Sequence, residues 1–359
     1  MRSNGRFLIS LDYELYWGLR DLLTLQEYRE RFPGEREAVL WLLQQFERHQ
    51  IHASWAVVGL MFCESREEML VSLPEELPGY ADANLSPYRY IAAGEFGDNE
   101  QEDADHYGLN VIKAIRETRH QRISTHTFSH YYCKEEGQTS EQFRADLKAA
   151  LRLAERKGVK IESVVFPRNQ FNETYIGVLK ELGIRAYRGN PHHRLYREGY
   201  STRDSVFAKA LRLLDTYVNL SGHHCYSATE LETEELANVP ASLFLRPYCS
   251  RLRLLERLRL RRILRGMTYA AKHGLIYHLW WHPYNLCRDP EENQAFLGRI
   301  LDHFDALQAR YGMQSVNMEE LAEAVLQTGS NGSNSSAASS LSACDGSVYS
   351  NSGEAIRFA

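Results

Sequence analysis

The chain has 359 residues, of which 43% are hydrophobic and 25% are charged, so it can bury a full core and is long enough for one α/β barrel with insertions. Its net charge of -5 does not indicate nucleic acid as a partner, and its six cysteines, scattered without CxxC spacing, do not form a disulfide framework. No apolar run is long enough for a transmembrane segment, and the strand-like run at 7–11 leaves no room for a signal peptide. We therefore expect a reduced, cytoplasmic protein.

The first predicted element is a buried parallel strand over residues 7–11, which leads directly into Asp12 and Glu14. If the strand continues to Glu14, its period of two places both carboxylates on one side and Leu11 and Tyr13 on the other. Two acids that share a face at the C-terminal end of a buried strand indicate a functional site. The alternative is a helix N-cap or a surface salt bridge.

A helix over residues 35–48 and a second strand over 53–59 follow. The polar, proline-containing stretch at 63–105 is interpreted as an insertion over one end of a barrel. A helix over 107–118 and a short strand over 122–125 then lead to His126 and His130. Two histidines four residues apart lie on one side of a helical turn, where they can share a divalent metal ion. The alternative is a pair of hydrogen-bonded histidines near the surface.

A capping box predicts a helix over residues 139–157, and the next strand, at 161–166, is followed by Arg168 and Asn169. After a helix that ends at residue 182 and a strand over 184–187, regular structure is expected to lapse from 188 to 250. Within that stretch, His223 and His224 form either a second metal cluster or part of an ordinary loop. The loop is favoured because adjacent side chains point in different directions.

Residues 251–265 alternate arginine with leucine and predict an amphipathic basic helix. It is either a contact with a membrane surface or an anionic substrate, or a barrel helix with a solvated basic face. A strand over 275–281 ends at His282, and a helix from Asp289 to Gly312, a strand at 314–316 and a helix over 318–326 complete the pattern. The Ser/Gly/Asn-rich residues 328–359 are expected to form a disordered tail.

About seven strand–helix repeats predict a parallel sheet closed into a distorted (β/α) barrel over residues 1–327, with polar insertions near 63–105 and 188–250. No GxGxxG motif follows the first strand, which argues against dinucleotide binding. Six polar residues each follow a predicted strand: Asp12, Glu14, His126, His130, Arg168 and His282. Because catalytic groups of such barrels collect at the C-terminal strand ends, this pattern favours a metal-dependent active site.

These motifs, in this order, resemble those of the polysaccharide deacetylase superfamily (carbohydrate esterase family 4) over most of residues 7–327. Four motifs of this chain have counterparts in that superfamily. They are the acid pair at the end of the first strand, the two-histidine motif with Thr after its first histidine, the arginine beside a proline, and the strand-end Leu-x-x-His at 279–282. The chain departs from the family in having Asp-x-Glu in place of Asp-Asp, a proline before the arginine, and no secretion signal.

The resemblance implies a role for each motif residue. Asp12 is the expected catalytic base, Arg168 braces it, and His282 is the general acid. One divalent metal, expected to be zinc with cobalt, manganese, nickel or iron as alternatives, is bound by Glu14, His126 and His130. The reaction is removal of an N-acetyl group from an amino sugar, with the oxyanion held by the metal and a backbone N–H near Tyr131.

The expected partner is a carbohydrate, either free or lipid-linked. The predicted substrate-binding residues are Trp17, Tyr131, Asn169 and Trp281. Trp17, Trp280 and Trp281 are candidate stacking surfaces for a sugar, with core packing as the alternative for the last two. Two other functions stay open: a non-catalytic or regulatory barrel of the same kind, and a metal hydrolase of another non-peptide C–N bond.

Overall fold

The computed structural model describes residues 4–196, 206–231 and 236–326, and the expected tail at 328–359 lies outside these ranges. The named strands of this part of the chain form one sheet, in which every pairing between them is parallel. They are β1 (Arg6–Tyr13), β2 (Ala53–Val57), β3 (Gln121–Thr125), β4 (Ser163–Val164), β5 (Ala186–Gly189), β6 (Ala237–Pro240), β7 (Leu243–Phe244), β8 (Ile276–Trp281) and β9 (Gln314–Val316).

The sheet bends into a barrel through the segment that carries β6 and β7. The strand order is β6-β5-β4-β3-β2-β1-β8-β7, and β9 pairs with the first residues of β1. Only Ala241 and Ser242 separate β6, which pairs with β5, from β7, which pairs with β8. The backbone N–H groups of these two residues donate to Gly189 on one side (3.0 Å) and to His278 on the other (2.7 Å). The predicted distorted (β/α) barrel of about seven strands is therefore confirmed, with β6 and β7 acting as one bent strand.

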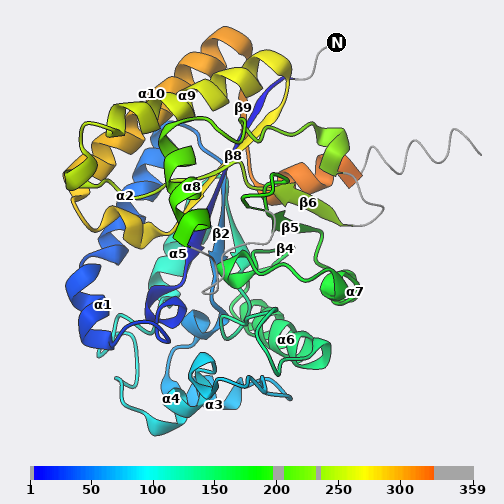
Figure 1. Cartoon of the computed structure of the whole chain (residues 1–359). Coiled ribbons are helices and arrows are strands. Elements are labelled where there is room, and N and C mark those ends of the chain that lie inside the picture. Colours follow the sequence, from blue (N-terminus) through cyan, green and yellow to red (C-terminus); the bar gives the residue numbers. More distant parts are fainter. Residues whose placement is uncertain (1–3, 197–205, 232–235, 327–359) are drawn as a thin grey trace, which may run out of the picture.

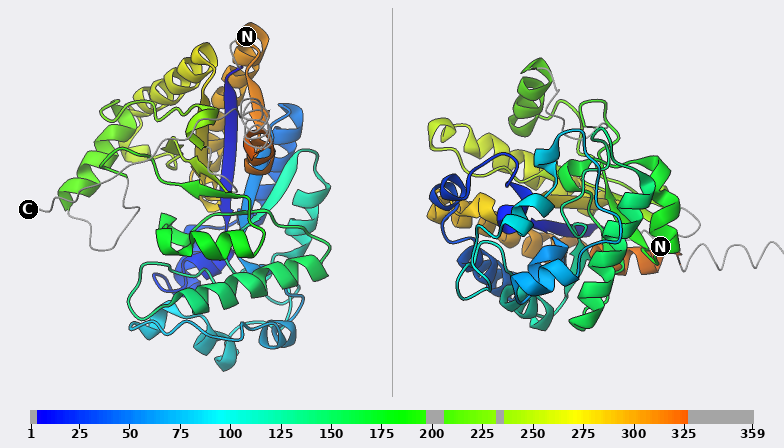
Figure 2. Two further views of the ribbon diagram at one scale, coloured as in Figure 1. Left: turned by 90° about the vertical axis from the view of Figure 1, so that its right-hand side faces the viewer. Right: turned by 90° about the horizontal axis from the view of Figure 1, so that it is seen from below.

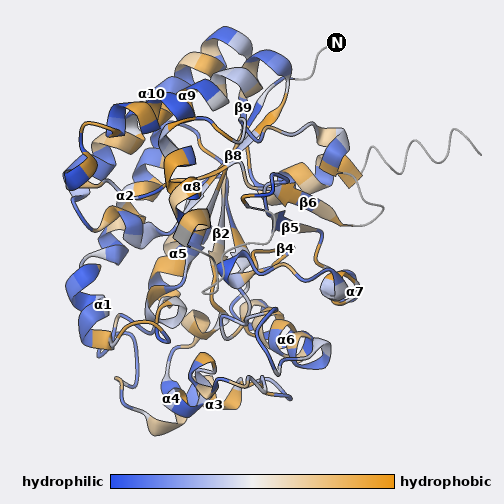
Figure 3. Cartoon of the chain, viewed as in Figure 1, coloured by the Kyte–Doolittle hydropathy of each residue, from blue (hydrophilic) through white to orange (hydrophobic). Residues whose placement is uncertain are grey.

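Helices surround this sheet on its outer side and beyond the C-terminal ends of its strands (Figure 1). They are α1 (Leu25–Arg31), α2 (Glu35–Arg48), α3 (Arg66–Val71), α4 (Tyr88–Ala93), α5 (Leu109–Glu117), α6 (Ser140–Arg156), α7 (Ile176–Glu181), α8 (Val206–Tyr217), α9 (Glu256–His273) and α10 (Pro290–Tyr311). Hydrophobic and hydrophilic bands alternate along them, as expected where one face of each helix packs against a sheet (Figure 3). The segment with α3 and α4, within the predicted insertion at 63–105, lies beyond the end toward which the strands run (Figure 1; Figure 2, left).

The prediction that regular structure lapses over residues 188–250 is wrong. This stretch contains the end of β5, helix α8 and strands β6 and β7. The two strands have four and two residues, too short for an alternating pattern to be recognised. They are strands because the backbones of β5 and β8 pair with them on either side.

Strand β1 divides its side chains between two hydrophobic clusters, as its period of two predicts. Leu11 and Tyr13 belong to the outer cluster, between the sheet and the helices, whereas Leu8 belongs to the cluster inside the barrel. Asp12 and Glu14 continue the inner row and are each only 2% exposed. The strand therefore places two carboxylates at the C-terminal mouth of the barrel.

The basic stretch at 251–265 agrees with the predicted barrel helix in its exposed arginines, Arg251, Arg253, Arg257, Arg261 and Arg265, but not in two others. Helix α9 begins at Glu256, and two of its arginines are buried in ion pairs rather than solvated: Arg259 with Glu256, and Arg262 with Asp215. Glu256 lies on α9 itself and Asp215 lies on α8, so the Arg262 pair joins α8 to α9. Across the described ranges, no helix has the length and apolarity that crossing a membrane requires.

Candidate active site

The C-terminal ends of β1, β3 and β8 bring five predicted site residues together. Asp12 lies at the end of β1 and Glu14 one residue beyond it, His126 and His130 follow β3, and His282 follows β8. Nε2 of His282 lies 3.8 Å from Asp12 Oδ2 and 3.6 Å from Glu14 Oε1. A cavity of about 350 Å³ opens at this mouth, and its lining includes all of these residues except His126. That volume is within the usual range for small-ligand sites.

Glu14, His126 and His130 each offer a ligand atom, and the three atoms lie within 4.8 Å of one another. The Nε2 atoms of His126 and His130 lie 3.4 and 3.1 Å from Glu14 Oε2. Tetrahedral zinc, with bonds of about 2.0–2.2 Å to nitrogen and oxygen, holds its ligand atoms roughly 3.3 Å apart, so this donor set fits a zinc-sized ion. A Cβ atom at Gly18 would lie 2.1 Å from Cδ of Glu14, so the carboxylate occupies space that only glycine leaves free.

Electrostatics keep Glu14 and His130 in the protonation states that a metal needs. Burial alone would raise the pKa of Glu14, but His282, His126 and His130 outweigh it and hold that pKa well below its ordinary value. Burial lowers the pKa of His130, even though the Glu14 carboxylate favours the charged form. A carboxylate and a neutral imidazole are the forms that bind divalent metals.

The two histidines meet through a bent loop and not through the predicted helical turn. Residues 126–130 have no helical assignment, and Thr127 and His130 have φ values of 64° and 59°, in the left-handed region. Thr127 Oγ1 accepts a hydrogen bond of 2.6 Å from the N–H of Tyr131, which closes the loop. The imidazole centroids are 5.0 Å apart. The two imidazoles therefore lie close together, as predicted, but because the loop closes on itself and not because of a helical turn.

Asp146, a residue that the sequence did not single out, holds this loop from helix α6. Its carboxylate accepts hydrogen bonds from the N–H of Phe128 (2.7 Å) and from the hydroxyl of Ser129. The side chain is fully buried, and burial raises its pKa to about 6. The acid thus fixes two of the three residues between the histidines.

The second nitrogen of each histidine has a protein partner. His126 Nδ1 lies 2.8 Å from the carbonyl oxygen of Val165, and His130 Nδ1 lies 3.1 Å from the hydroxyl of Tyr132. The Tyr132 hydroxyl donates in turn to Asp21 (3.1 Å). Such outer contacts fix the ring orientation and leave Nε2 for a metal.

Arg188, and not Arg168, contacts the expected base. Both Nη atoms of Arg188 donate to Asp12 at 2.6 Å, and the pair is buried. Arg168 instead pairs with Asp21 and lies 4.3 Å above the ring of Tyr132. The predicted bracing of Asp12 by Arg168 is therefore wrong, because Arg168, in the turn after β4, reaches Asp21 instead.

The Arg188 contact sets the charge of Asp12. Burial would raise the pKa of Asp12, but the guanidinium of Arg188, together with His126 and His282, outweighs it and leaves that pKa below its ordinary value. Asp12 is consequently ionised. His282 stacks on Tyr284, with ring centroids 4.6 Å apart, and its side chain is 18% exposed at the mouth.

Three of the four predicted substrate-binding residues lie outside the cavity lining. Trp17 is 3% exposed and donates to the carbonyl of His106, Trp281 is fully buried in the outer cluster, and the Tyr131 hydroxyl bonds to Gln138 and to the backbone of Thr139. These are packing roles. Asn169 does line the cavity.

The aromatic indole in the cavity wall belongs to Trp280. It alternates with Trp281 along β8 and so faces inward, on the same side as His282. The predicted oxyanion donor near Tyr131 is also unsuitable, because its N–H donates to Thr127 and the next N–H, of Tyr132, donates to Tyr80 (2.8 Å).

His223 and His224 belong to none of the groups of potential metal ligands found in the described ranges. His224 has a φ of 48° and its Nε2 lies 2.7 Å from Ser221 Oγ, whereas His223 packs near Tyr269. Burial lowers the pKa of His224 to about 4. Their geometry agrees with the loop alternative.

No protein-family model and no curated protein sequence matches the chain. Solved structures do match its fold. A protein from Mycobacterium smegmatis classed as a polysaccharide deacetylase has a TM-score of 0.53 at 15% identity, with 91% of this chain and 92% of that one covered. One of the same class from Pseudomonas aeruginosa PAO1 has a TM-score of 0.52 at 12% identity, covering 89% and 90%. An allantoinase has a TM-score of 0.50 at 11% identity, also covering 89% and 90%. At these identities the likeness establishes the fold, which is that of polysaccharide deacetylases.

Proposed function

We propose that this protein is a metal-dependent hydrolase that removes the N-acetyl group from an amino sugar. The observation that carries the proposal is the meeting of one carboxylate and two imidazoles, Glu14, His126 and His130, at zinc-ligand spacing beside Asp12 and His282. Zinc as the metal, the cytoplasmic location and the membrane contact through 251–265 stay predictions from the sequence.

A divalent metal held by this set would lower the pKa of a bound water and polarise the acyl oxygen. Asp12 is the proton acceptor for the attacking water. Each of its oxygens receives one hydrogen bond from Arg188 and retains a second lone pair for a water proton. Because Arg188 favours the ionised carboxylate, Asp12 is deprotonated at neutral pH and ready to accept.

His282 is the proton donor to the departing amine. Its Nε2 lies 3.8 Å from Oδ2 of Asp12 and 3.6 Å from Oε1 of Glu14, so it reaches the same space as the proposed base and the proposed metal ligand. Stacking on Tyr284 keeps the ring at the mouth of the cavity, where a substrate would enter. Arg168 acts as a positioning residue, since it holds Asp21, which in turn accepts from Tyr132 beside His130.

A second candidate is hydrolysis of another non-peptide C–N bond in a small molecule. This candidate is supported by the structural likeness to a protein named as an allantoinase, which has a barrel of the same kind. A barrel that binds metal without turnover is the third possibility. The same residues would hold the metal in all three cases.

The test is metal analysis combined with acetate release. Purified protein should contain one zinc-sized ion per chain, and His126→Ala with His130→Ala should remove it. The loaded protein should release acetate from N-acetylhexosamine compounds, whereas Asp12→Asn should keep the metal and lose about 10²–10⁴ in rate. Undiminished metal in the double variant would refute the ligand set. Metal binding without acetate release from any such compound would favour the other two candidates.

A further inference from the structure

Helix α8 presents apolar side chains to the solvent. On α8 and the residues just after it, the large apolar side chains that are exposed are Phe207, Leu213, Leu214, Val218 and Leu220. Phe207, Leu214 and Val218 follow at spacings of seven and four, so they lie along one side of the helix. Phe207 is 72% exposed, and Figure 3 colours much of α8 as hydrophobic. The exposed side of a helix in a globular domain is ordinarily polar or charged, so this side of α8 favours a partner.

The start of α9 adds exposed leucines next to α8. Leu254 is 83% exposed, and Leu255 and Leu258 are also exposed. Leu255, Leu258 and Arg262 follow at spacings of three and four, and Arg262 is the residue that pairs with Asp215 of α8 (2.7 Å). These leucines therefore lie on the side of α9 that meets α8. The docking face is defined here as the exposed apolar residues Phe207, Leu213, Leu214, Val218, Leu220, Leu254, Leu255 and Leu258.

The exposed charges on the same two segments are all positive. They belong to Lys209, Arg251, Arg253, Arg257, Arg261 and Arg265. Over residues 206–220 and 250–265, all of which the structure describes, the only carboxylates are those of Asp215 and Glu256, and both are buried in ion pairs. This local excess of cations contrasts with the net charge of -5 for the whole chain. Apolar side chains beside arginines are typical of a segment that lies on an anionic membrane surface.

The form of the docking face favours a bilayer surface over other occupants. Helix α8 has 12 residues, too few to cross a bilayer, so it can only lie in the interface between headgroups and acyl chains. A second copy of the chain fits less well. A symmetric dimer sets the same patch against itself, and here it would bring two positively charged surfaces together.

We propose that the docking face binds the surface of a bilayer that contains anionic lipids. The apolar side chains enter the boundary between headgroups and acyl chains, and the arginines beside them bind the lipid phosphates. This inference goes beyond a membrane contact through 251–265, because most of the apolar residues belong to α8 and the turn after it, which the sequence did not reveal.

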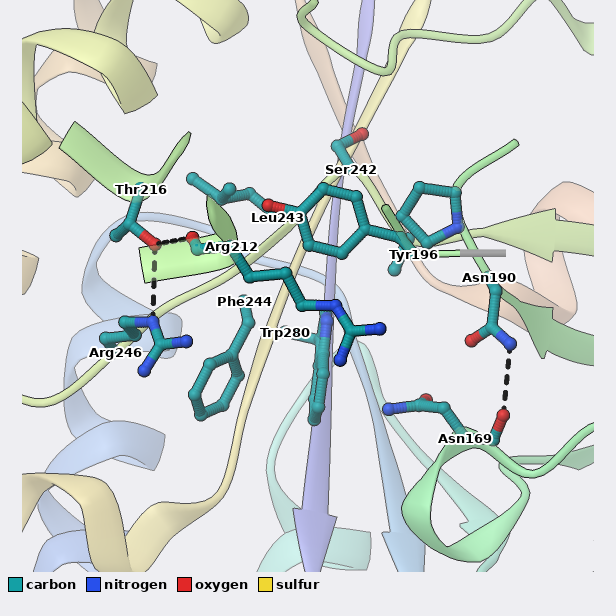
Figure 4. A pocket seen from close by; sticks show the side chains of 12 residues that line it. Asn169, Asn190, Tyr196, Arg212, Thr216, Ser242, Leu243, Phe244, Arg246 and Trp280 are labelled. Carbon is teal, nitrogen blue, oxygen red and sulfur yellow. Dashed lines mark hydrogen bonds between the residues drawn. The ribbon is translucent and has the colours of Figure 1, made fainter. Parts of the chain in front are cut away.

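The inner side of α8 connects to the active-site cavity. Arg246 lines that cavity and donates through Nε to Thr216 of α8 at 3.3 Å (Figure 4). Thr216 is buried and lies two residues from both Leu214 and Val218, on the opposite side of the helix. Docking would therefore hold the active-site cavity roughly one helix diameter, about 10 Å, from the bilayer.

The test is co-sedimentation of the full-length protein with vesicles of phosphatidylcholine alone and of an equal mixture of phosphatidylcholine and phosphatidylglycerol. We expect binding to the mixed vesicles that weakens as salt is added, and little binding to the neutral ones. Phe207→Gln should weaken binding about tenfold, because it removes a large apolar side chain from the interface. Val71→Gln is the matched control, because Val71 is equally exposed, at 72%, but lies on α3. Equal binding by the two variants would refute the docking face.

The arginines are tested in the same assay. Arg257→Gln with Arg261→Gln should weaken binding to the mixed vesicles about 10- to 30-fold, because two cations near the lipid surface are lost. Arg119→Gln with Arg122→Gln makes the same change of charge at exposed positions in and beside β3 and should have little effect. All of these variants replace exposed side chains, so their melting temperatures should match that of the unaltered protein. An equal loss of binding in the two pairs would show attraction by net charge alone and refute the docking face.

Sedimentation equilibrium without vesicles tests the second copy as the occupant. A dimer that Phe207→Gln dissociates, together with no binding to the mixed vesicles, would refute membrane docking and assign the face to self-association. A monomer that binds the mixed vesicles through Phe207 would support the proposal. Binding is measured without substrate, so its failure would leave the proposed function intact, and absence of acetate release would leave the docking face intact.

Discussion

The carboxylate of Asp12 accepts two hydrogen bonds of 2.6 Å from the guanidinium of Arg188, 176 residues further along the chain. Arg188 also lies 4.1 Å above the ring of Trp280 and donates to Ser10 (3.1 Å) inside the barrel. One arginine thus joins the proposed base, the cavity wall and the barrel interior.

Arg188→Met should destabilise the fold by about 3–5 kcal/mol, because it leaves the Asp12 carboxylate buried without its partner. Urea unfolding at pH 7 measures this. The double variant Arg188→Met with Asp12→Asn should recover much of the stability, since neither charge remains, but no acetate release. A double variant as unstable as the single one would show that Arg188 stabilises the barrel by packing alone.

Tyr132→Phe should weaken metal binding about 10- to 100-fold, because it removes the hydroxyl between His130 Nδ1 and Asp21. Competition with a chromophoric zinc chelator measures the affinity. Tyr131→Phe is the matched control, since that hydroxyl bonds to Gln138 and Thr139, away from the histidines. Equal affinities in the two variants would contradict the role given to Tyr132.

Much of the barrel could be predicted because its signals are local. The period of two in β1 places Asp12 and Glu14 inward, and proline and glycine mark the two ends of α10. The short strands β6 and β7 could not be predicted, because only their pairing partners determine them. The barrel was therefore predictable, but the segment that closes it was not.

The site residues also differ in whether a local sequence signal could have revealed them. Arg188 was missed because it lies one residue beyond the predicted fifth strand, although it alternates with Ala186 of the inner cluster and so could have been assigned inward. That Arg188 pairs with Asp12, by contrast, could not be predicted, because the pairing depends on the curvature of the barrel. Asp146 had no signal at all, since an aspartate within a helix is ordinary in sequence.

Trp280→Leu should raise KM for the sugar substrate with little effect on catalysis by bound enzyme, because this indole lines the cavity. Trp281→Phe should leave KM unchanged and cost about 1–3 kcal/mol of stability, because its side chain packs against Phe46 in the outer cluster. Steady-state kinetics and urea unfolding of both variants test this. If Trp281→Phe changed KM and Trp280→Leu did not, the prediction from the sequence that Trp281 binds the substrate would be correct.

Glu35, at the start of α2, should make the protein less stable as the pH rises from about 5 to 8. One oxygen of this buried carboxyl accepts from Tyr28 (2.6 Å) and the other has no hydrogen-bond partner in the described ranges. Burial, the largest cause, raises its pKa from 4.5 to about 8. Between these values the folded state holds a proton that the unfolded state has released, so the free energy of unfolding falls by about 1.4 kcal/mol per pH unit from this group.

Glu35→Gln, which keeps an acceptor for Tyr28 and cannot ionise, should abolish this contribution. Its advantage over the unaltered protein in urea unfolding should therefore be small at pH 5 and grow toward pH 8, where the unaltered carboxyl begins to charge in the folded state. Glu37→Gln removes a charge from an exposed position two residues away on the same helix and should change stability equally at both pH values. If the two variants show the same pH dependence, Glu35 is ionised in the folded protein, and the buried carboxyl must have gained a partner that neutralises its charge.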